Sequence, residues 1–287
     1  MLYYTENITK LLGKYAKMLI MKTENIKLAI FDIDDTLIKR GKITVEPSAV
    51  KAINKLKASG IEVMIATGRA FYFIHDDIHE TIQPNYYVTI NGACVYNKDH
   101  NVIFSVPMIR DEVNAMITYS LEHNLGLGMK MQQSMEIVND MNVFQTVYMQ
   151  GSPKLDILDD KTNLKFIPEG DEVPMGLFLM GDEATIEASH PLSPDGFYAK
   201  AYADAYDIYS KRAGKISGIE EVLGQLNLTW NEVITFGDAA NDMEMLEKAA
   251  IGVAMGNAPE HVKECADFVT HDILDDGIAH AINTLFK

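Results

Sequence analysis

The stretch KLAIFDIDDTLIKR, residues 27–40, decides how the rest of the sequence is interpreted. Four apolar residues, 28–31, lead directly into Asp32, Asp34 and Asp35. Carboxylates at the end of a buried strand repel one another and lose hydration, so their accumulation costs free energy unless a cation offsets it. Residues two apart on an extended segment face the same way, so Asp32 and Asp34 can serve one centre. The stretch therefore predicts a buried strand that ends at a cation site.

The composition of the 287-residue chain argues against two classes of function. Its formal net charge is −16, whereas nucleic-acid-binding proteins usually present a basic face. The same negative charge disfavours docking on anionic membrane surfaces. An anionic substrate would therefore have to be attracted by a local cation. The length allows one large domain or two ordinary ones.

Two cysteines, Cys94 and Cys265, lie far apart in the sequence and form no CxxC pattern. Neither a zinc site nor a disulfide framework is indicated, which favours a cytoplasmic protein. No apolar run reaches the length of a membrane-spanning helix. Residues 1–21 lack the continuous apolar core and the cleavage site of a signal peptide, so we interpret them as an N-terminal extension.

Apolar strands alternate with helical segments along most of the chain. The predicted helix at residues 46–60 has Pro47 in its first turn, apolar residues on one face and Gly60 at its end. Continuous apolar strands separated by helices predict a doubly wound, Rossmann-like α/β fold, in which helices cover both faces of a parallel sheet. The predicted strands are residues 27–33, 61–68, 85–92, 232–238 and 251–255, and the other predicted helices are residues 69–82, 215–226, 241–249, 258–266 and 276–286.

The alternation stops after Gly92. A hairpin is predicted next, and a Met-rich stretch interrupted by prolines follows it. We interpret residues 108–192 as an inserted α+β domain, which leaves residues 22–107 and 193–287 as the core. The predicted elements of this region are the hairpin at 93–108, which turns at 97–101, helices at 110–124 and 156–166, and a strand at 175–181.

Polar residues follow three of the predicted strands. In an open parallel sheet, ligands bind at the carboxyl ends of strands, so these polar residues are expected to meet. Converging carboxylates without His or Cys favour a hard divalent cation held by oxygen, Mg²⁺ first. A carboxylate beside such a cation can attack phosphorus, and hydroxyl, amide and lysine donors can bind the transferring oxygens. The residues concerned are 32–34, 67–69 and 237–238, with Lys215, Asn241 and Asp242 at the starts of predicted helices.

These residues resemble the four motifs of the haloacid dehalogenase superfamily. The motifs are DIDDT at 32–36, TGR at 67–69, Lys215 and GDAAND at 237–242. NGA at 91–93, GNA at 256–258, and ADFVT with DDGI near the C-terminus are similar to its Cof-type branch of capped class IIB sugar phosphatases. The resemblance implies a cap inserted between the second and third motifs. It also implies a Mg²⁺-dependent phosphatase that acts on small phosphorylated metabolites through an aspartyl-phosphate.

The resemblance also implies a role for each motif residue. Asp32 would be the nucleophile and a metal ligand, and Asp34 the general acid/base, whose carbonyl also binds the metal. Asp238 and Asp242 would complete the metal site. The residues expected to contact the substrate or its phosphoryl group are Thr67, Gly68, Arg69, Asn91, Lys215 and Asn241. Two positions depart from the common pattern without carrying chemistry, Asp35 and Ala239, and Lys211 is a nearby rival to Lys215.

Several features have a functional and a purely structural interpretation. His75 and His79 stand four apart on a predicted helix, a spacing that zinc can use, but a solvated face explains them without a third ligand. Lys130 can meet a second anionic group on a substrate, or it can be an ordinary surface lysine. MGNAPEH at 255–261 can be a phosphate loop or a turn from strand to helix.

Two other functions stay open beside the phosphatase. A phosphotransferase or phosphomutase would use the same aspartyl-phosphate, and a non-enzymatic sensor of phosphorylated metabolites would keep the site for binding alone. We expect a monomer or a weak homodimer. The physiological substrate cannot be predicted, because the resemblance is weakest in the cap.

Overall fold

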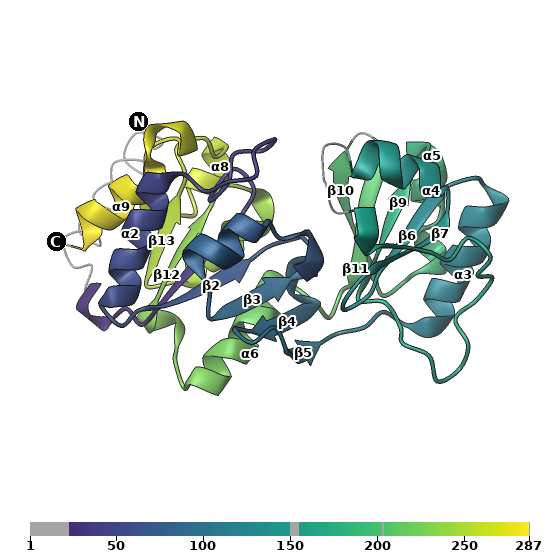
Figure 1. Cartoon of the computed structure of the whole chain (residues 1–287), viewed down its shortest axis with the longest axis horizontal. Helices are drawn as coiled ribbons and strands as arrows, with labels where there is room; N and C mark the ends of the chain where they lie inside the picture. The colour runs from purple at the N-terminus through teal and green to yellow at the C-terminus, as the bar shows by residue number, and fades with distance from the viewer. Residues whose placement is uncertain (1–22, 150–154, 203, 287) are drawn as a thin grey trace, which may run out of the picture.

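The computed structural model describes residues 23–149, 155–202 and 204–286, which form two lobes (Figure 1). The predicted extension, residues 1–21, lies outside the described residues. None of the helices in the described parts of the chain has the length and apolar character that a membrane span requires.

The first lobe is built on a sheet with the strand order β14-β13-β12-β1-β2-β3-β4-β5. The pairs from β14 to β3 are parallel, and β4 and β5 add an antiparallel edge, which is the predicted hairpin. The doubly wound parallel sheet is therefore confirmed. The strands are β1 (Leu28–Phe31), β2 (Glu62–Ala66), β3 (Tyr86–Thr89), β4 (Cys94–Asn97), β5 (Val102–Ser105), β12 (Val233–Gly237), β13 (Ile251–Ala254) and β14 (Phe268–Val269).

Helices cover both faces of this sheet because alternate residues of its strands enter different cores. Ala29 and Phe31 pack in the core beneath α2 (Pro47–Ala58) and α9 (Gly277–Leu285). Leu28 and Ile30 pack on the other face, beneath α6 (Lys215–Leu226) and α7 (Met243–Lys248). This two-sided burial explains the uninterrupted apolar run that precedes Asp32. A short α8 (Glu260–Lys263) lies between β13 and β14 in the sequence.

The second lobe, the cap, is built on a sheet with the order β10-β11-β9-β6-β7-β8. Helices α3 (Arg110–Glu122) and α5 (Glu183–Ala188) contribute to the core on one face of this sheet. On the other face, α4 (Met141–Val143) and η5 (Phe144–Tyr148) contribute to a second core. The strands are β6 (Gly126–Lys130), β7 (Met135–Asn139), β8 (Leu158–Asp160), β9 (Gly176–Met180), β10 (Gly196–Tyr202) and β11 (Ala205–Ser210).

The cap extends further along the chain than predicted. Strands β10 and β11 form an antiparallel hairpin, and β11 pairs with β9 of the cap. The boundary predicted at residue 193 is therefore too early, and the chain returns to the core only between β11 and α6. At this return, Arg212 Nη2 donates a hydrogen bond to the carbonyl of Pro107 (3.0 Å), which lies on the outgoing connection.

One predicted helix is interrupted and another is wrong. Residues 69–82 form the short turn η2 (Phe71–Phe73), where the Phe71 ring stacks on Tyr96, and are helical only in their second half, which ends in the π-helix η3 (Ile78–Ile82). His79 is not on a solvated helical face, since its Nδ1 lies 3.0 Å from Tyr87 Oη. Residues 156–166 contain η6 (Leu155–Ile157) and the edge strand β8, which ends in a turn held by the Asp160 carboxylate.

Candidate active site

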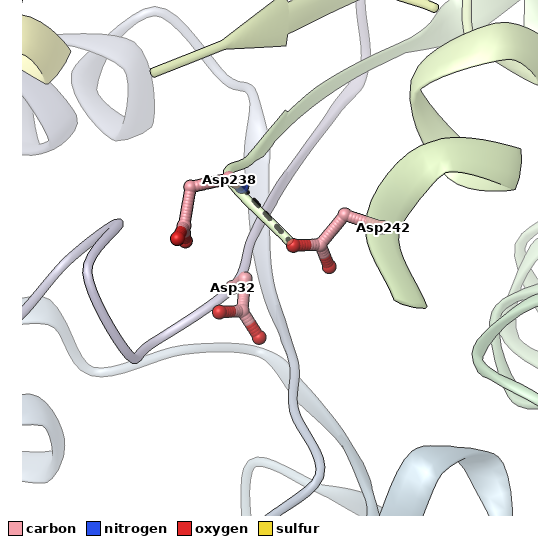
Figure 2. A group of neighbouring side chains, drawn as sticks. All are labelled: Asp32, Asp238 and Asp242. Atoms are coloured by element: carbon pink, nitrogen blue, oxygen red, sulfur yellow. Dashed lines mark hydrogen bonds between the residues drawn. The ribbon is translucent and has the colours of Figure 1, made fainter. Parts of the chain in front are cut away.

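The three predicted strand ends meet at one edge of the core sheet. β12, β1 and β2 are neighbours, so Asp238, Asp32 and Thr67 follow parallel strands side by side. One oxygen each of Asp32, Asp238 and Asp242 can be chosen so that all lie within 4.8 Å of one another (Figure 2). Among the described residues, this is the acidic group arranged to hold a metal ion.

Lys215 offsets much of the repulsion at this edge. It is the first residue of α6, and its buried Nζ donates to Asp32 Oδ1 (2.7 Å) and to Asp242 Oδ1 (2.6 Å). Burial lowers the pKa of Lys215, but the two carboxylates raise it by more, so the side chain stays charged. Lys211, the rival in the sequence, is exposed and donates to the carbonyl of Pro194.

The pKa of Asp32 is raised well above its ordinary value. Burial is the main cause, the charge of Lys215 opposes it, and Asp242 and Asp34 add to it. A further positive charge near Asp32 would therefore stabilise its ionised form. Three ionised carboxylates and one ammonium group leave a net charge of about −2, which one divalent cation would neutralise.

Asp238 and Asp242 are held by bonds within their own loop. Thr36 Oγ1 donates to Asp238 Oδ1 (2.7 Å), and Asp242 Oδ2 accepts from the amides of Asp238 (3.1 Å) and Ala239 (3.0 Å), the first of which is drawn in Figure 2. A Cβ on Gly237 would lie 2.5 Å from that of Asp242, so glycine is required there. Burial raises the pKa of Asp238 to about 6, although the bond from Thr36 opposes it.

The raised pKa of Asp238 predicts how Mg²⁺ affects stability at different pH. A carboxyl whose pKa is higher in the folded than in the unfolded chain makes the metal-free protein less stable as the pH rises towards and through about 6. Mg²⁺ needs the ionised carboxylate and removes that penalty. We therefore expect Mg²⁺ to raise the melting temperature more at about pH 7.5 than at about pH 5.

Thermal melts in EDTA and in Mg²⁺ at both pH values test this prediction. Asp238→Asn is expected to reduce the rise, whereas Asp99→Asn, in the exposed turn between β4 and β5, is the matched control and should leave it unchanged. Equal rises at the two pH values would contradict the assignment of Asp238 to a metal site.

Asp34 forms a two-pronged ion pair with Arg69. Arg69 Nε and Nη2 donate to its two carboxylate oxygens (2.9 and 2.7 Å), and Arg69 Nη1 donates to the carbonyl of Phe73 (3.0 Å). Burial raises the pKa of Asp34, but the hydrogen bonds and the charge of Arg69 outweigh it, so the net pKa is lowered. Arg69, which is expected to contact the substrate, thus faces the candidate general acid.

The remaining predicted residues lie around Asn91. Asn241 Nδ2 donates to Asn91 Oδ1 (3.0 Å), and a Cβ on Gly68 would lie 3.2 Å from Asn91 Nδ2. Thr67 is buried, and its Oγ1 accepts from the amide of Arg69 (3.2 Å). Asn91 therefore connects the loop after β2 with the loop after β12.

The turn that carries Asn91 is strained. Both Ile90 and Asn91 have a φ of 49°, and such a value is unusual for a β-branched residue. The next residue, Gly92, has a φ of 93°, and a Cβ there would lie 1.9 Å from the carbonyl oxygen of Gly214. The absence of a side chain at Gly92 allows the start of α6, and with it Lys215, to approach β3.

Two supporting residues were not identified from the sequence. Thr36, in DIDDT, orients Asp238, and its position in that motif was the available signal. Asn257, in GNA, donates to the carbonyl of Asp35 (2.9 Å) and accepts from the amide of Ile273 (3.0 Å). These bonds explain GNA as a turn that ties the Asp35 loop to the C-terminal segment.

Comparison with known proteins agrees with this arrangement. The haloacid dehalogenase-like hydrolase family matches residues 29–282. This chain belongs to that family. The haloacid dehalogenase-like chain is 30% identical over 269 residues to a putative bifunctional phosphatase/peptidyl-prolyl cis-trans isomerase of Streptococcus pyogenes, covering 92% of this chain and 55% of that protein. It thus spans little more than half of that relative's length.

Two further proteins match over nearly their whole length. The putative phosphatase YkrA of Bacillus subtilis is 29% identical over 261 residues, which cover 90% of this chain and 97% of YkrA. The solved subclass IIB sugar phosphatase BT4131 is 25% identical with a TM-score of 0.75, covering 90% of this chain and 98% of that one. The predicted family, fold class and enzyme class, a haloacid dehalogenase-like phosphatase, are confirmed.

Proposed function

We propose that the chain is a Mg²⁺-dependent phosphatase that hydrolyses small phosphate monoesters, sugar phosphates first, through an aspartyl-phosphate on Asp32. The observation that carries this proposal is the ammonium of Lys215 held between Asp32 and Asp242, with Asp238 beside them. The subclass IIB sugar phosphatase among the similar structures supports the substrate class.

Asp32, Asp238 and Asp242, with the main-chain carbonyl of Asp34, would hold the Mg²⁺. The all-oxygen donor set and its surplus of negative charge fit this ion. When bound, it supplies positive charge for the phosphoryl oxygens and the Asp32 carboxylate.

In the first half of the reaction, an Asp32 carboxylate oxygen forms a bond to phosphorus while the bond from phosphorus to the ester oxygen breaks. Asp34 donates a proton to that leaving oxygen. Lys215 fixes the orientation of Asp32, and Thr67, Asn241 and the amides near Gly68 donate to the phosphoryl oxygens.

In the second half, a water molecule attacks phosphorus and gives its proton to Asp34, which restores Asp32 and releases phosphate. Without a substrate, the hydrogen bonds and the charge of Arg69 lower the pKa of Asp34. An arriving phosphoryl group brings negative charge next to Asp34 and so favours its protonated form. We assign Arg69 to the positioning of Asp34, and Asn91 to the positioning of Asn241 and of the Gly68 loop.

We also propose a cytoplasmic location for this enzyme. The sequence has only two cysteines, and Cys94 is a buried free thiol. Few cysteines and a free thiol are typical of a reducing compartment.

Phosphate release from a panel of phosphorylated metabolites, with Mg²⁺ and with EDTA, tests the proposed function. The expected result is Mg²⁺-dependent release, fastest with sugar phosphates. Transfer of the phosphoryl group to a second sugar phosphate instead of to water would identify a phosphomutase, and binding without turnover would identify a sensor.

The leaving group should decide how strongly Asp34→Asn reduces the rate. A sugar alkoxide needs a proton to leave, whereas an aryl oxide does not. We expect kcat to fall about 10²- to 10⁴-fold with a sugar phosphate and far less with p-nitrophenyl phosphate. Steady-state kinetics on both substrates measure this difference, and equal losses would count against Asp34 as the general acid.

A further inference from the structure

The turn at residues 90–92 lies where the core meets the cap. It follows β3, and Figure 1 shows β3 and β4 at the end of the core lobe that faces the cap. Ile90 is only 1% exposed and packs in the same apolar cluster as Met175 and Tyr209 of the cap. Its Cγ2 lies against the first residue of β9, since a Cβ on Gly176 would lie 3.2 Å from it. The side chain of Ile90 is therefore a direct contact between the two lobes.

The backbone of this turn is bonded to the loop after β2. The amide of Ile90 donates to the carbonyl of Arg69 (2.8 Å), and the amide of Asn91 donates to the carbonyl of Thr67 (3.1 Å). These two bonds fix the turn relative to the loop that carries Thr67 and Arg69.

Two further parts of the active site touch the same turn. Asn91 Oδ1 accepts a hydrogen bond from Asn241 Nδ2 (3.0 Å), which belongs to the loop after β12. Gly92 lies against the backbone of Gly214, the residue that precedes Lys215. Three consecutive residues thus connect the cap with Asn241 and with the start of α6.

The conformation of Ile90 needs a physical reason. A φ of 49° is unfavourable for a β-branched residue, and glycine or asparagine would adopt it at a lower cost in free energy. Strained residues persist only where their surroundings hold them, and they cluster at functional sites. The branched side chain is what isoleucine adds at this place, and its Cγ2 is the atom that lies against Gly176. The contact with the cap therefore explains why isoleucine occupies a strained position.

We propose that Ile90 is a positioning residue. Strand β9 of the cap, through its contact at Gly176, holds residues 90–92 in place, and these residues set the positions of Asn241 and Lys215. This inference rests on the proposed phosphatase function, in which Asn241 donates to the phosphoryl group and Lys215 orients the nucleophile. Because the phosphoryl group is common to all substrates, Ile90 affects the rate on each of them and does not select among leaving groups.

Ile90→Ala tests the role of the side chain. Loss of Cγ2 removes the contact with the cap, so kcat should fall about tenfold on both a hexose 6-phosphate and p-nitrophenyl phosphate, with KM changed by less than about threefold. Ile90→Val keeps the branched Cγ2 and should retain at least about half of kcat. Ile282→Ala, in α9, is the matched control, because it removes the same atoms from the same apolar cluster. It should lower the melting temperature without lowering kcat.

Gly176→Ala tests the contact from the side of the cap. The added methyl group would lie 3.2 Å from Ile90 Cγ2 and 2.9 Å from the carbonyl oxygen of Ile208, so it should displace the turn and lower kcat about tenfold. In the Ile90→Ala background, the same substitution should lower kcat by less than about twofold further, because the contact is already absent. Gly126→Ala in β6 is the control, since its methyl group would meet Val143 Cγ1 at 2.9 Å within the cap, and it should leave kcat unchanged.

A measurement without substrate tests the position of Asn241 directly. In ¹⁵N-labelled protein, Ile90→Ala should shift the NMR signals of the Asn241 side-chain amide, which are identified by their loss in Asn241→Ser. Ile282→Ala should leave these signals in place.

The outcomes separate this inference from the proposed function. If the unsubstituted enzyme is active and Ile90→Ala lowers kcat no more than Ile282→Ala does, Ile90 only fills the core and the inference is refuted. Effects of Gly176→Ala and Ile90→Ala that multiply to about 100-fold would refute the contact with the cap. If the unsubstituted protein hydrolyses no phosphate ester, the proposed function is refuted, and unshifted Asn241 signals would then refute the positioning by Ile90.

Discussion

Asp32→Asn is expected to abolish phosphate release from every phosphate ester, by at least about 10⁴-fold in kcat. An amide does not attack phosphorus and is a poor ligand for a hard metal ion. The fold should persist, because Lys215 keeps its bond to Asp242 and asparagine has nearly the volume of aspartate. Release of phosphate from p-nitrophenyl phosphate and circular dichroism measure the two expectations.

Asp35→Asn is the matched control for this substitution. Asp35 lies three residues further along the same loop, pairs with Lys39 and Arg40, and has a φ of 61°, a conformation that asparagine tolerates. It should retain most of the activity. If Asp32→Asn kept more than a trace of turnover, Asp32 would not be the nucleophile.

Lys215→Met is expected to have the largest effect on stability. It removes the cation between two buried carboxylates and leaves them uncompensated, which should lower the free energy of unfolding by about 3–5 kcal/mol. The pKa of Asp32, already raised by burial, should rise further without Lys215. Proton uptake then relieves the repulsion, so the loss should be smaller at about pH 5 than at about pH 8.

Urea unfolding in EDTA at both pH values measures this loss. Lys211→Met is the control, because Lys211 is exposed and bonds only to a main-chain carbonyl, and it should change stability by about 0.5 kcal/mol or less. A loss for Lys215→Met that does not depend on pH would mean that lost packing, and not carboxylate repulsion, causes it.

The sequence was sufficient to predict the convergence of Asp32, Thr67 and Asp238. These residues follow buried parallel strands, and parallel strands place their carboxyl ends at one edge of the sheet. A local pattern of an apolar strand followed by a polar residue therefore predicts which residues far apart in the sequence come together. The same reasoning could not show that Arg69 pairs with Asp34. That contact depends on how the segment after Arg69 folds. The predicted helix is interrupted there, and Phe71 stacks on Tyr96.

The cap was less predictable because its sheet pairs strands that are far apart in the sequence, such as β6 with β9. The hairpin of β10 and β11 lies beyond residue 192, where the insertion was predicted to end, and only its pairing with β9 assigns it to the cap. The burial of Lys130 was equally hidden, since no neighbour in the sequence reveals that Asp207, 77 residues away, is its partner.

The hydrogen bond from Arg212 to the carbonyl of Pro107 has a consequence for folding kinetics. It joins the point where the chain leaves the core to the point where it returns, 105 residues later. For the core, the whole cap is then a single loop with adjacent ends. The entropy of closing such a loop grows only with the logarithm of its length, so the long insertion adds little to the barrier for assembling the core sheet. We therefore expect the length of the cap to affect the refolding rate of the core much less than the pairing of β1 with β12 does, since both of those strands must be in place before the aspartates can meet.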